Sequence, residues 1–255
     1  MRLSMLRWAV LFNLAKAWRL DLPIPVGRLV RVFKLNSSLT YKFLKELEAG
    51  GVVERVGRGL WALRDTARAR ALAEYVLELR PDSPFDYWTS TVPEVYYYIP
   101  DPPFKEWFGF PEKYLVIADE VLRGRISPPE DEYTVIYTSL RGRSWSYERS
   151  RGYSRGGREQ SVADILSYDP NWPIEVDLYW NMDKLDMDDV ARRCTPRGLR
   201  RLSTFLSFLA LVSNPLPTKI TYNYLALLDP EILWENLSYY TSIVYANGVA
   251  DRWGI

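Results

Sequence analysis

Short polar and cationic side chains line a predicted helix over residues 36–49, which is followed by Gly50-Gly51. Residues 36–38 supply side chains that can cap a helix start, and a glycine supplies the positive φ that ends one. The side chains that this helix can present outward are Ser37, Ser38, Thr40, Tyr41, Lys42 and Lys45. A helix enters the major groove of DNA when its outward face is short, polar and cationic. These residues are therefore predicted to contact base edges in duplex DNA.

A basic turn follows this helix, because two β-type runs in 52–63, "VVERV" and "LWAL", are joined through Gly57-Arg58-Gly59. An arginine between glycines can approach a phosphate or enter a minor groove. We expect Arg58 to do so, with Arg55 reaching along the same wing. Three further cations, on and just after a helix predicted over 26–33, are Arg28, Arg31 and Lys34. We expect these three to hold backbone phosphates.

The order of elements over residues 1–64 predicts an N-terminal winged helix-turn-helix. Apolar residues at helical spacing indicate a first helix over 3–18, which Pro23 and Pro25 end before the two later helices and the hairpin. This region carries 12 basic and four acidic residues, a net charge of +8, which leaves −7 for the rest of a chain whose net charge is +1. A basic module joined to an acidic part indicates one anion-binding end.

The remainder predicts a linker helix over 65–83 and a mixed α+β domain over 84–255. The helix has Asp65 or Thr66 as its cap and joins the domains or pairs protomers, and "RPDSPFD" at 80–86 is the expected boundary. Strands are predicted at 94–99, 113–118, 132–140 and 144–148. Helices are predicted at 160–166, 187–194, 196–212 and within 228–247. The predicted fold class is α+β.

The composition excludes several kinds of chemistry. Cys194 is the only cysteine and there is no histidine, so an internal disulfide, a Cys/His zinc site and a histidine-dependent triad are all excluded. We expect no cofactor. No apolar run is long enough to cross a bilayer, so we expect a cytoplasmic protein with no membrane partner. Scarce glutamine and cysteine beside abundant arginine and glutamate are typical of a thermophilic source.

An arginine-rich stretch over 141–158 has two interpretations. Its cations are Arg141, Arg143, Arg149, Arg151, Arg155 and Arg158, and Trp145, Tyr147 and Tyr153 are interspersed among them. Such a mixture can grip phosphates and stack bases. It is equally typical of a solvated hairpin whose arginines protect a sheet edge, or of a surface that docks on an acidic partner. We favour the solvated hairpin.

Two acidic segments raise the question of a metal site. Glu175 and Asp177 alternate with apolar residues over 174–180, and on one face of a strand they could hold Mg²⁺ for nucleotidyl transfer. This makes a divergent nucleotidyltransferase the alternative enzymatic hypothesis. The acidic residues over 181–190 are better explained by helix capping, with Asp186 as the cap and Asp189 three residues later.

Two segments of the second domain, after the predicted winged helix, resemble the AbiEi antitoxin family of type IV toxin–antitoxin systems. The first, 158–169, matches the family's helix at Glu159, Ala163, Asp164 and Leu166, with Gly157-Arg158 in place of Ser-Pro. The second, 185–212, matches at Asp186, Val190, Arg200, Arg201, Leu202 and Phe205, with Ser203 in place of glycine. The resemblance implies a transcriptional regulator that binds inverted repeats upstream of its own operon. It also implies a C-terminal domain that opposes a separate nucleotidyltransferase toxin.

Together these patterns predict a sequence-specific DNA-binding regulator, antitoxin-like and not an enzyme, which binds duplex DNA as a homodimer. Three alternatives remain. The first is the magnesium-dependent nucleotidyltransferase using Glu175 and Asp177. The second is a winged-helix module that binds a protein partner, and the third is a protein that coats DNA without sequence preference.

Overall fold

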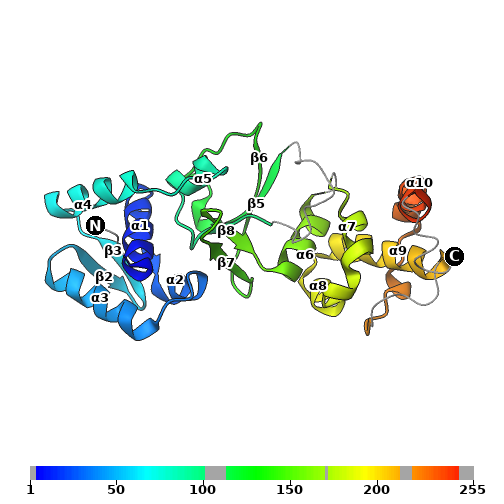
Figure 1. Cartoon of the computed structure of the whole chain (residues 1–255), viewed down its shortest axis with the longest axis horizontal. Coiled ribbons are helices and arrows are strands. Elements are labelled where there is room, and N and C mark those ends of the chain that lie inside the picture. The colour runs from blue at the N-terminus through cyan, green and yellow to red at the C-terminus, as the bar shows by residue number, and fades with distance from the viewer. Residues whose placement is uncertain (1–3, 101–112, 170–171, 213–219, 247–255) are drawn as a thin grey trace. The chain divides into compact units, whose positions relative to one another are not determined.

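A computed structural model of the protein describes residues 4–100, 113–169, 172–212 and 220–246 (Figure 1). The chain divides into two compact units, one of residues 1–99 with 116–156 and the other of residues 100–115 with 157–255. Helices and short sheets are both present, so the predicted α+β class is confirmed. Among the described residues, no helix combines the length and the apolarity needed to cross a membrane.

The first unit begins with three helices and a hairpin. Its described helices are α1 (Met5–Arg19), α2 (Val26–Val32), α3 (Ser37–Ala49), α4 (Ala67–Glu78) and α5 (Asp86–Thr91), with a 3-10 turn η1 (Glu120–Leu122). Strands β1 (Ile24–Pro25), β2 (Val53–Gly57) and β3 (Leu60–Leu63) form an antiparallel sheet in the order β1-β3-β2. The helix and hairpin positions predicted over 1–64 are confirmed to within about two residues, the usual uncertainty of helix ends.

Two further small sheets complete this unit. Strands β4 (Tyr97–Tyr98), β5 (Tyr114–Asp119) and β6 (Tyr133–Thr138) form one sheet, in the order β4-β5-β6. Strands β7 (Trp145–Glu148) and β8 (Tyr153–Gly156) form an antiparallel hairpin. A parallel bridge between Arg155 and Ile99, the residue after β4, links this hairpin to the β4-β5-β6 sheet. The strand predicted over 94–99 is therefore confirmed only at Tyr97–Tyr98.

Helix α1 is the centre of the first unit. The sequence predicts a helix with one apolar face, but every residue from Ala9 to Ala17 is buried, including Asn13 and Lys16. Helix α4 packs its apolar face on α1, and β7 packs on α2. The linker helix predicted over 65–83 therefore lies within the first unit, capped by Thr66. The boundary expected near residue 83 does not coincide with the division at 156/157, because residues 84–99 and 116–156 share a core with α1 and α2.

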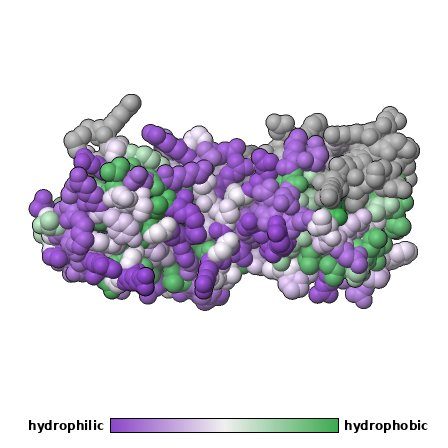
Figure 2. All heavy atoms as spheres, turned by 90° about the horizontal axis from the view of Figure 1, so that it is seen from below, coloured by the Kyte–Doolittle hydropathy of each residue, from purple (hydrophilic) through white to green (hydrophobic). Residues whose placement is uncertain are grey.

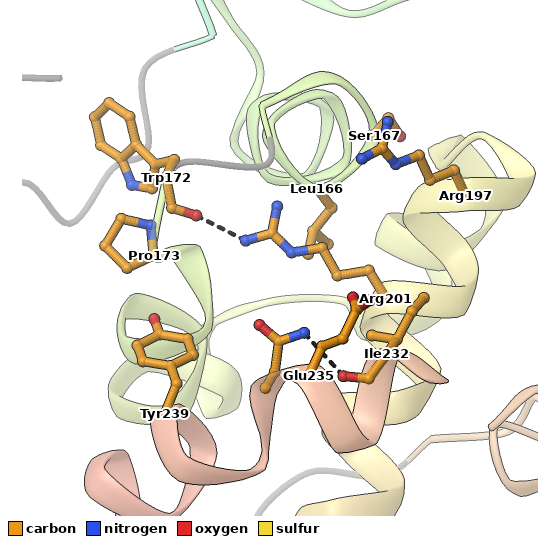
Figure 3. A pocket seen from close by; sticks show the side chains of 10 residues that line it. Leu166, Ser167, Trp172, Pro173, Arg197, Arg201, Ile232, Glu235 and Tyr239 are labelled. Atoms are coloured by element: carbon orange, nitrogen blue, oxygen red, sulfur yellow. Dashed lines mark hydrogen bonds between the residues drawn. The ribbon is translucent and has the colours of Figure 1, made fainter. Parts of the chain in front are cut away.

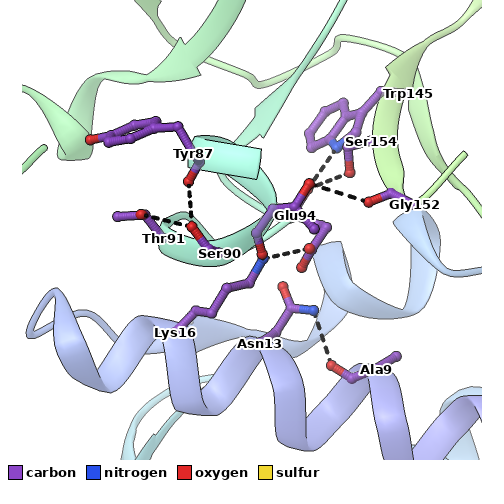
Figure 4. Close-up of polar contacts among 11 residues, drawn as sticks. Ala9, Asn13, Lys16, Tyr87, Ser90, Thr91, Glu94, Trp145, Gly152 and Ser154 are labelled. Atoms are coloured by element: carbon purple, nitrogen blue, oxygen red, sulfur yellow. Dashed lines mark hydrogen bonds and ion pairs between the residues drawn. The ribbon is translucent and has the colours of Figure 1, made fainter. Parts of the chain in front are cut away.

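A fully buried ion pair ties α1 to the segment before β4 (Figure 4). Lys16 Nζ lies 2.5 Å from Glu94 Oε1 and donates a second hydrogen bond to the Thr89 carbonyl at 3.1 Å. Both side chains are 0% exposed. Burial lowers the pKa of Lys16 and raises the pKa of Glu94, while their mutual attraction opposes both shifts. The pair therefore stabilises the contact between α1 and residues 89–94, and the loss of either member would leave an uncompensated buried charge.

From residue 157 onwards, the described regular elements of the second unit are all helical. Its elements are α6 (Arg158–Tyr168), α7 (Ile174–Asn181), η2 (Met182–Lys184), α8 (Met187–Arg193), α9 (Pro196–Val212), η3 (Leu225–Leu227) and α10 (Pro230–Ala246). Helix α9 packs on α6 and α10, with Phe205 and Tyr240 in ring contact at 5.2 Å. Gly198 permits the approach to α6, because a Cβ there would lie 2.4 Å from Ser167 Oγ. The helices predicted at 160–166, 187–194, 196–212 and within 228–247 are all confirmed.

Candidate nucleic-acid interface

Helix α3 starts and stops where its sequence dictates. The Asn36 side chain accepts a hydrogen bond from the Leu39 backbone N–H at 3.0 Å, which caps the first turn. Gly51, with a φ of +70°, follows the last turn and allows the chain to reverse into β2. The helix therefore occupies a fixed position between its cap and the hairpin.

The exposed face of α3 is polar and cationic. At about 100° per residue, Ser38, Tyr41, Lys42 and Lys45 fall within an arc of about 100°. All four are exposed, as is Ser37 beside them. On the face drawn in Figure 2, hydrophilic residues cover much of the end formed by α3 and its neighbours, with small apolar patches between them. This arc is an accessible part of α3, beside which Leu39 and Glu46 are also exposed.

The acidic residues of α3 lie outside this arc. Glu46 and Glu48 fall about 20° to 40° beyond its two edges. Lys45 lies 2.7 Å from Glu48 and 5.4 Å from the Trp61 ring centroid, so its cation is drawn from within the arc towards Glu48 beside it. The arc itself therefore presents cations and hydroxyls, the groups that contact phosphates and base edges.

The turn between β2 and β3 lies beside this face. Gly57 pairs with Leu60, which leaves Arg58 and Gly59 as the turn, and Gly59 has a φ of +72° that favours glycine. A Cβ on Gly59 would lie 4.0 Å from the Tyr41 hydroxyl, so α3 and the turn are neighbours. Arg58 is exposed, and Arg55 is exposed with its Nε bonded to the Gly57 carbonyl at 3.2 Å.

Two predicted DNA contacts are wrong. Thr40 is fully buried, and its hydroxyl donates to the Asn36 carbonyl at 2.8 Å, because it falls on the side of α3 that faces the core. Arg28 lies 2.6 Å from Asp119 and donates to the Val95 carbonyl at 3.2 Å, so its guanidinium is part of the first unit's packing. Neither residue can serve the role that the sequence indicates for it.

The other two predicted phosphate contacts lie at the surface. Arg31, on α2, is exposed and its guanidinium carbon lies 5.1 Å from the Trp145 ring centroid. Lys34, just after α2, is exposed and has a φ of +52°, an uncommon conformation for a residue other than glycine. Both cations therefore remain accessible to an anionic ligand.

The arginine-rich stretch over 141–158 folds around buried aromatic residues. Trp145 and Tyr153 are buried, and Tyr147 stacks on Phe33 at 4.8 Å, so these rings are packed into the protein rather than displayed for bases. Arg143 donates to the Ser139 carbonyl and to the Tyr98 hydroxyl. The interpretation as a base-stacking platform is therefore wrong for these aromatic residues.

The carboxylates proposed to hold magnesium are not on a strand. Residues 174–181 form α7, and residues two apart on a helix point in different directions. Both Arg201 Nε and Nη2 contact Glu175, at 2.6 and 2.8 Å, so this carboxylate is already bound. Burial raises the pKa of Asp177 to about 6. Among the described residues, no three His, Cys, Asp or Glu side chains cluster as metal ligands.

The acidic segment over 181–190 caps a helix, as predicted. Asp186 accepts a hydrogen bond from the Asp189 backbone N–H at 2.9 Å at the start of α8. The residues that carry the family resemblance are largely packing residues, since Ala163, Leu166, Val190, Leu202 and Phe205 are all buried. They therefore account for how α6, α8 and α9 pack.

The sequence gives no indication of a cavity of about 430 Å³ in the second unit (Figure 3). Its walls come from the end of α6, from residues 172–173, and from α9 and α10. Because these segments are separated by about 30 residues or more in places, no local motif marks the site. Only the packing of helices brings its residues together.

Comparison with known proteins adds no assignment. The chain matches no model of a protein family, and no curated protein sequence is significantly similar to it.

Proposed function

We propose that the N-terminal module is a winged helix that binds duplex DNA and that the protein is a DNA-binding transcriptional regulator. The observation that carries this proposal is the exposed arc of α3, which presents hydroxyls and cations without an acidic residue and has the Arg58-Gly59 turn beside it. Three helices followed by a hairpin, with β1 added to β3, also support a winged helix.

In this proposal α3 lies in the major groove. Residues for base-edge contact are Ser37, Ser38, Tyr41, Lys42 and Lys45. Arg55 and Arg58 reach along the wing, and Arg31 and Lys34 neutralise backbone phosphates. The net charge of +8 over residues 1–64 favours this role, because cations near phosphates release counterions on binding.

The finer proposal is an antitoxin-like autoregulator that binds inverted repeats as a homodimer. It rests on the resemblance of residues 158–169 and 185–212 to AbiEi antitoxins. A nucleotidyltransferase encoded beside the protein's own gene, together with suppression of its toxicity on co-expression, would support this role. Toxicity that is unchanged by co-expression would contradict it while leaving the DNA-binding proposal intact.

The test is DNA binding by the purified protein across a salt series, on fragments of its own upstream region and on random duplex. Tighter binding to the upstream region supports a sequence-specific regulator. Equal, salt-dependent binding to both would instead identify a protein that coats DNA. No binding to either would leave a module for a protein partner.

Matched variants test the assigned face. Lys42→Ala should weaken binding to the upstream fragment and reduce its preference over random duplex, because Lys42 is assigned to a base edge. Arg58→Ala should weaken binding and reduce the slope of log affinity against log salt by about 0.9, the value for one phosphate contact. Arg123→Ala is the control, since Arg123 is an exposed cation of the same unit that pairs with Glu120 outside the proposed interface. If both test variants retained the parent's affinity and slope, the proposed face would be wrong.

A further inference from the structure

The cavity in the second unit has the size of a small-molecule site. Its volume of about 430 Å³ lies within the range of ligand pockets, about 300 to 1,000 Å³. Leu166, Pro173 and Ile232 give it apolar walls, and polar side chains of α9 and α10 reach it from other sides (Figure 3). The cavity is therefore lined by both apolar and polar side chains, and polar groups are what fix the orientation of a bound ligand.

One arginine of the cavity is already committed to the protein. Arg201 binds both oxygens of Glu175, and it also donates to the carbonyls of Asp169 and Trp172, both at 2.7 Å. The guanidinium and the carboxylate cancel in charge. This part of the wall therefore fixes the shape of the cavity and requires no charge on a ligand.

Two other charged side chains lack such partners. Arg197, on α9, and Glu235, on α10, line the cavity with side chains that are exposed to solvent, and across the described ranges neither makes an ion pair. They are of opposite sign and come from different helices. A ligand that lies between them would meet a cation at one end and an anion at the other.

A third polar group of the cavity is unsatisfied. The Tyr239 hydroxyl is buried, and within the described part of the chain it has no hydrogen-bond partner. Figure 3 shows the Tyr239 ring on the same side as Pro173. A buried hydroxyl without a partner is costly. Because its oxygen is fully enclosed by the protein, it contributes no contact to a ligand in the cavity.

We propose that this cavity binds a small zwitterionic ligand of the amino-acid class. Arg197 binds its carboxylate and Glu235 binds its ammonium group, since charge-assisted hydrogen bonds are the strong ones in such sites. The apolar part of the ligand packs against Leu166, Pro173 and Ile232. The proposal does not depend on DNA binding, because every lining residue belongs to the second unit.

The test is calorimetric titration of the full-length protein with three probes of one shape. L-phenylalanine carries both charges, phenylpropanoate lacks the ammonium group, and phenethylamine lacks the carboxylate. L-phenylalanine should bind at least about tenfold more tightly than either comparison compound, because each lost contact is a hydrogen bond to a charged group. No binding of L-phenylalanine at millimolar concentration, or equal binding of all three probes, would overturn the proposal.

Exchanging each charged residue should remove one specific preference. Arg197→Gln should abolish the preference for L-phenylalanine over phenethylamine, and Glu235→Gln should abolish its preference over phenylpropanoate. Arg200→Gln on α9 and Glu231→Gln on α10 are the controls, since these residues are exposed like Arg197 and Glu235 but do not line the cavity. Thermal unfolding of all four variants verifies that they fold. Loss of affinity in the controls as large as in the test variants would refute the assignment.

Discussion

Replacing Lys16 by methionine should destabilise the first unit by removing one member of its buried ion pair. Methionine has a similar length and no charge, so it fills most of the same space. The change leaves Glu94 buried with Oε2 already lacking a hydrogen-bond partner, and it removes the donor that Oε1 and the Thr89 carbonyl share. Removing one partner of a buried pair costs about 3–5 kcal/mol. We expect the free energy of unfolding to fall by that amount at neutral pH.

The loss should depend on pH in a defined direction. Without the cation, burial raises the pKa of Glu94 further above that of the unfolded chain, because the attraction of Lys16 no longer opposes it. The folded state then binds more protons than the unfolded state, so stability falls as pH rises above about 4.3. The slope is at most about 1.4 kcal/mol per pH unit and disappears above the raised pKa. The variant should therefore recover part of its stability on acidification.

A double substitution separates the pair's net effect from the penalty of an orphan charge. Lys16→Met with Glu94→Met removes both charges, and such replacements of buried pairs are often neutral or stabilising. The double variant should therefore be more stable than the single one by several kcal/mol. Urea unfolding followed by circular dichroism, at about pH 5 and pH 7.5, measures all three proteins. A single variant within about 1 kcal/mol of the parent at both pH values would refute the reasoning.

Two further predictions concern the second unit. Asp177→Asn should remove a pH dependence of stability. In the parent, the raised pKa of about 6 makes the folded state bind an extra proton, so the free energy of unfolding falls by up to about 3 kcal/mol as pH rises from about 4 to about 6. An unchanged stability profile in this window would contradict the assignment. Burial raises the pKa of Cys194 to about 12, so its thiol should react with iodoacetamide far more slowly in the folded protein than in urea, and equal rates would show that the thiol is not protected.

The elements of the candidate site were predictable because their signals are local. Asn36 caps α3 through a hydrogen bond three residues away, and Gly51 ends it through its own φ. The turn at Arg58-Gly59 was predictable because glycines flank Arg58 between two β-type runs. Asp186 likewise caps α8 from within the same turn. Hydrogen bonds and backbone preferences of this range are fully contained in a short stretch of sequence.

The tertiary structure alone decided which polar residues are available. Thr40 belongs to the same run as Ser38 and Tyr41, but its position on the helix turns it towards the core. Arg28 was predicted to hold a phosphate, but the fold brings Asp119, 91 residues later, to within 2.6 Å of it. The fold likewise pairs Lys16 with Glu94, 78 residues later. The alternation over 174–180 would place Glu175 and Asp177 on one face only in a strand, but the segment is a buried helix whose Glu175 side chain pairs with Arg201 of α9.

The physical reason is the range of the interactions. Caps, turns and periodic apolar residues act over a few positions, so the sequence by itself determined the helices and hairpin of the first module and most helices of the second unit. Burial and ion pairing depend on residues that meet only when separate elements pack. The accessible arc of α3, the committed guanidinium of Arg28 and the cavity between α6, α9 and α10 were therefore decided by packing.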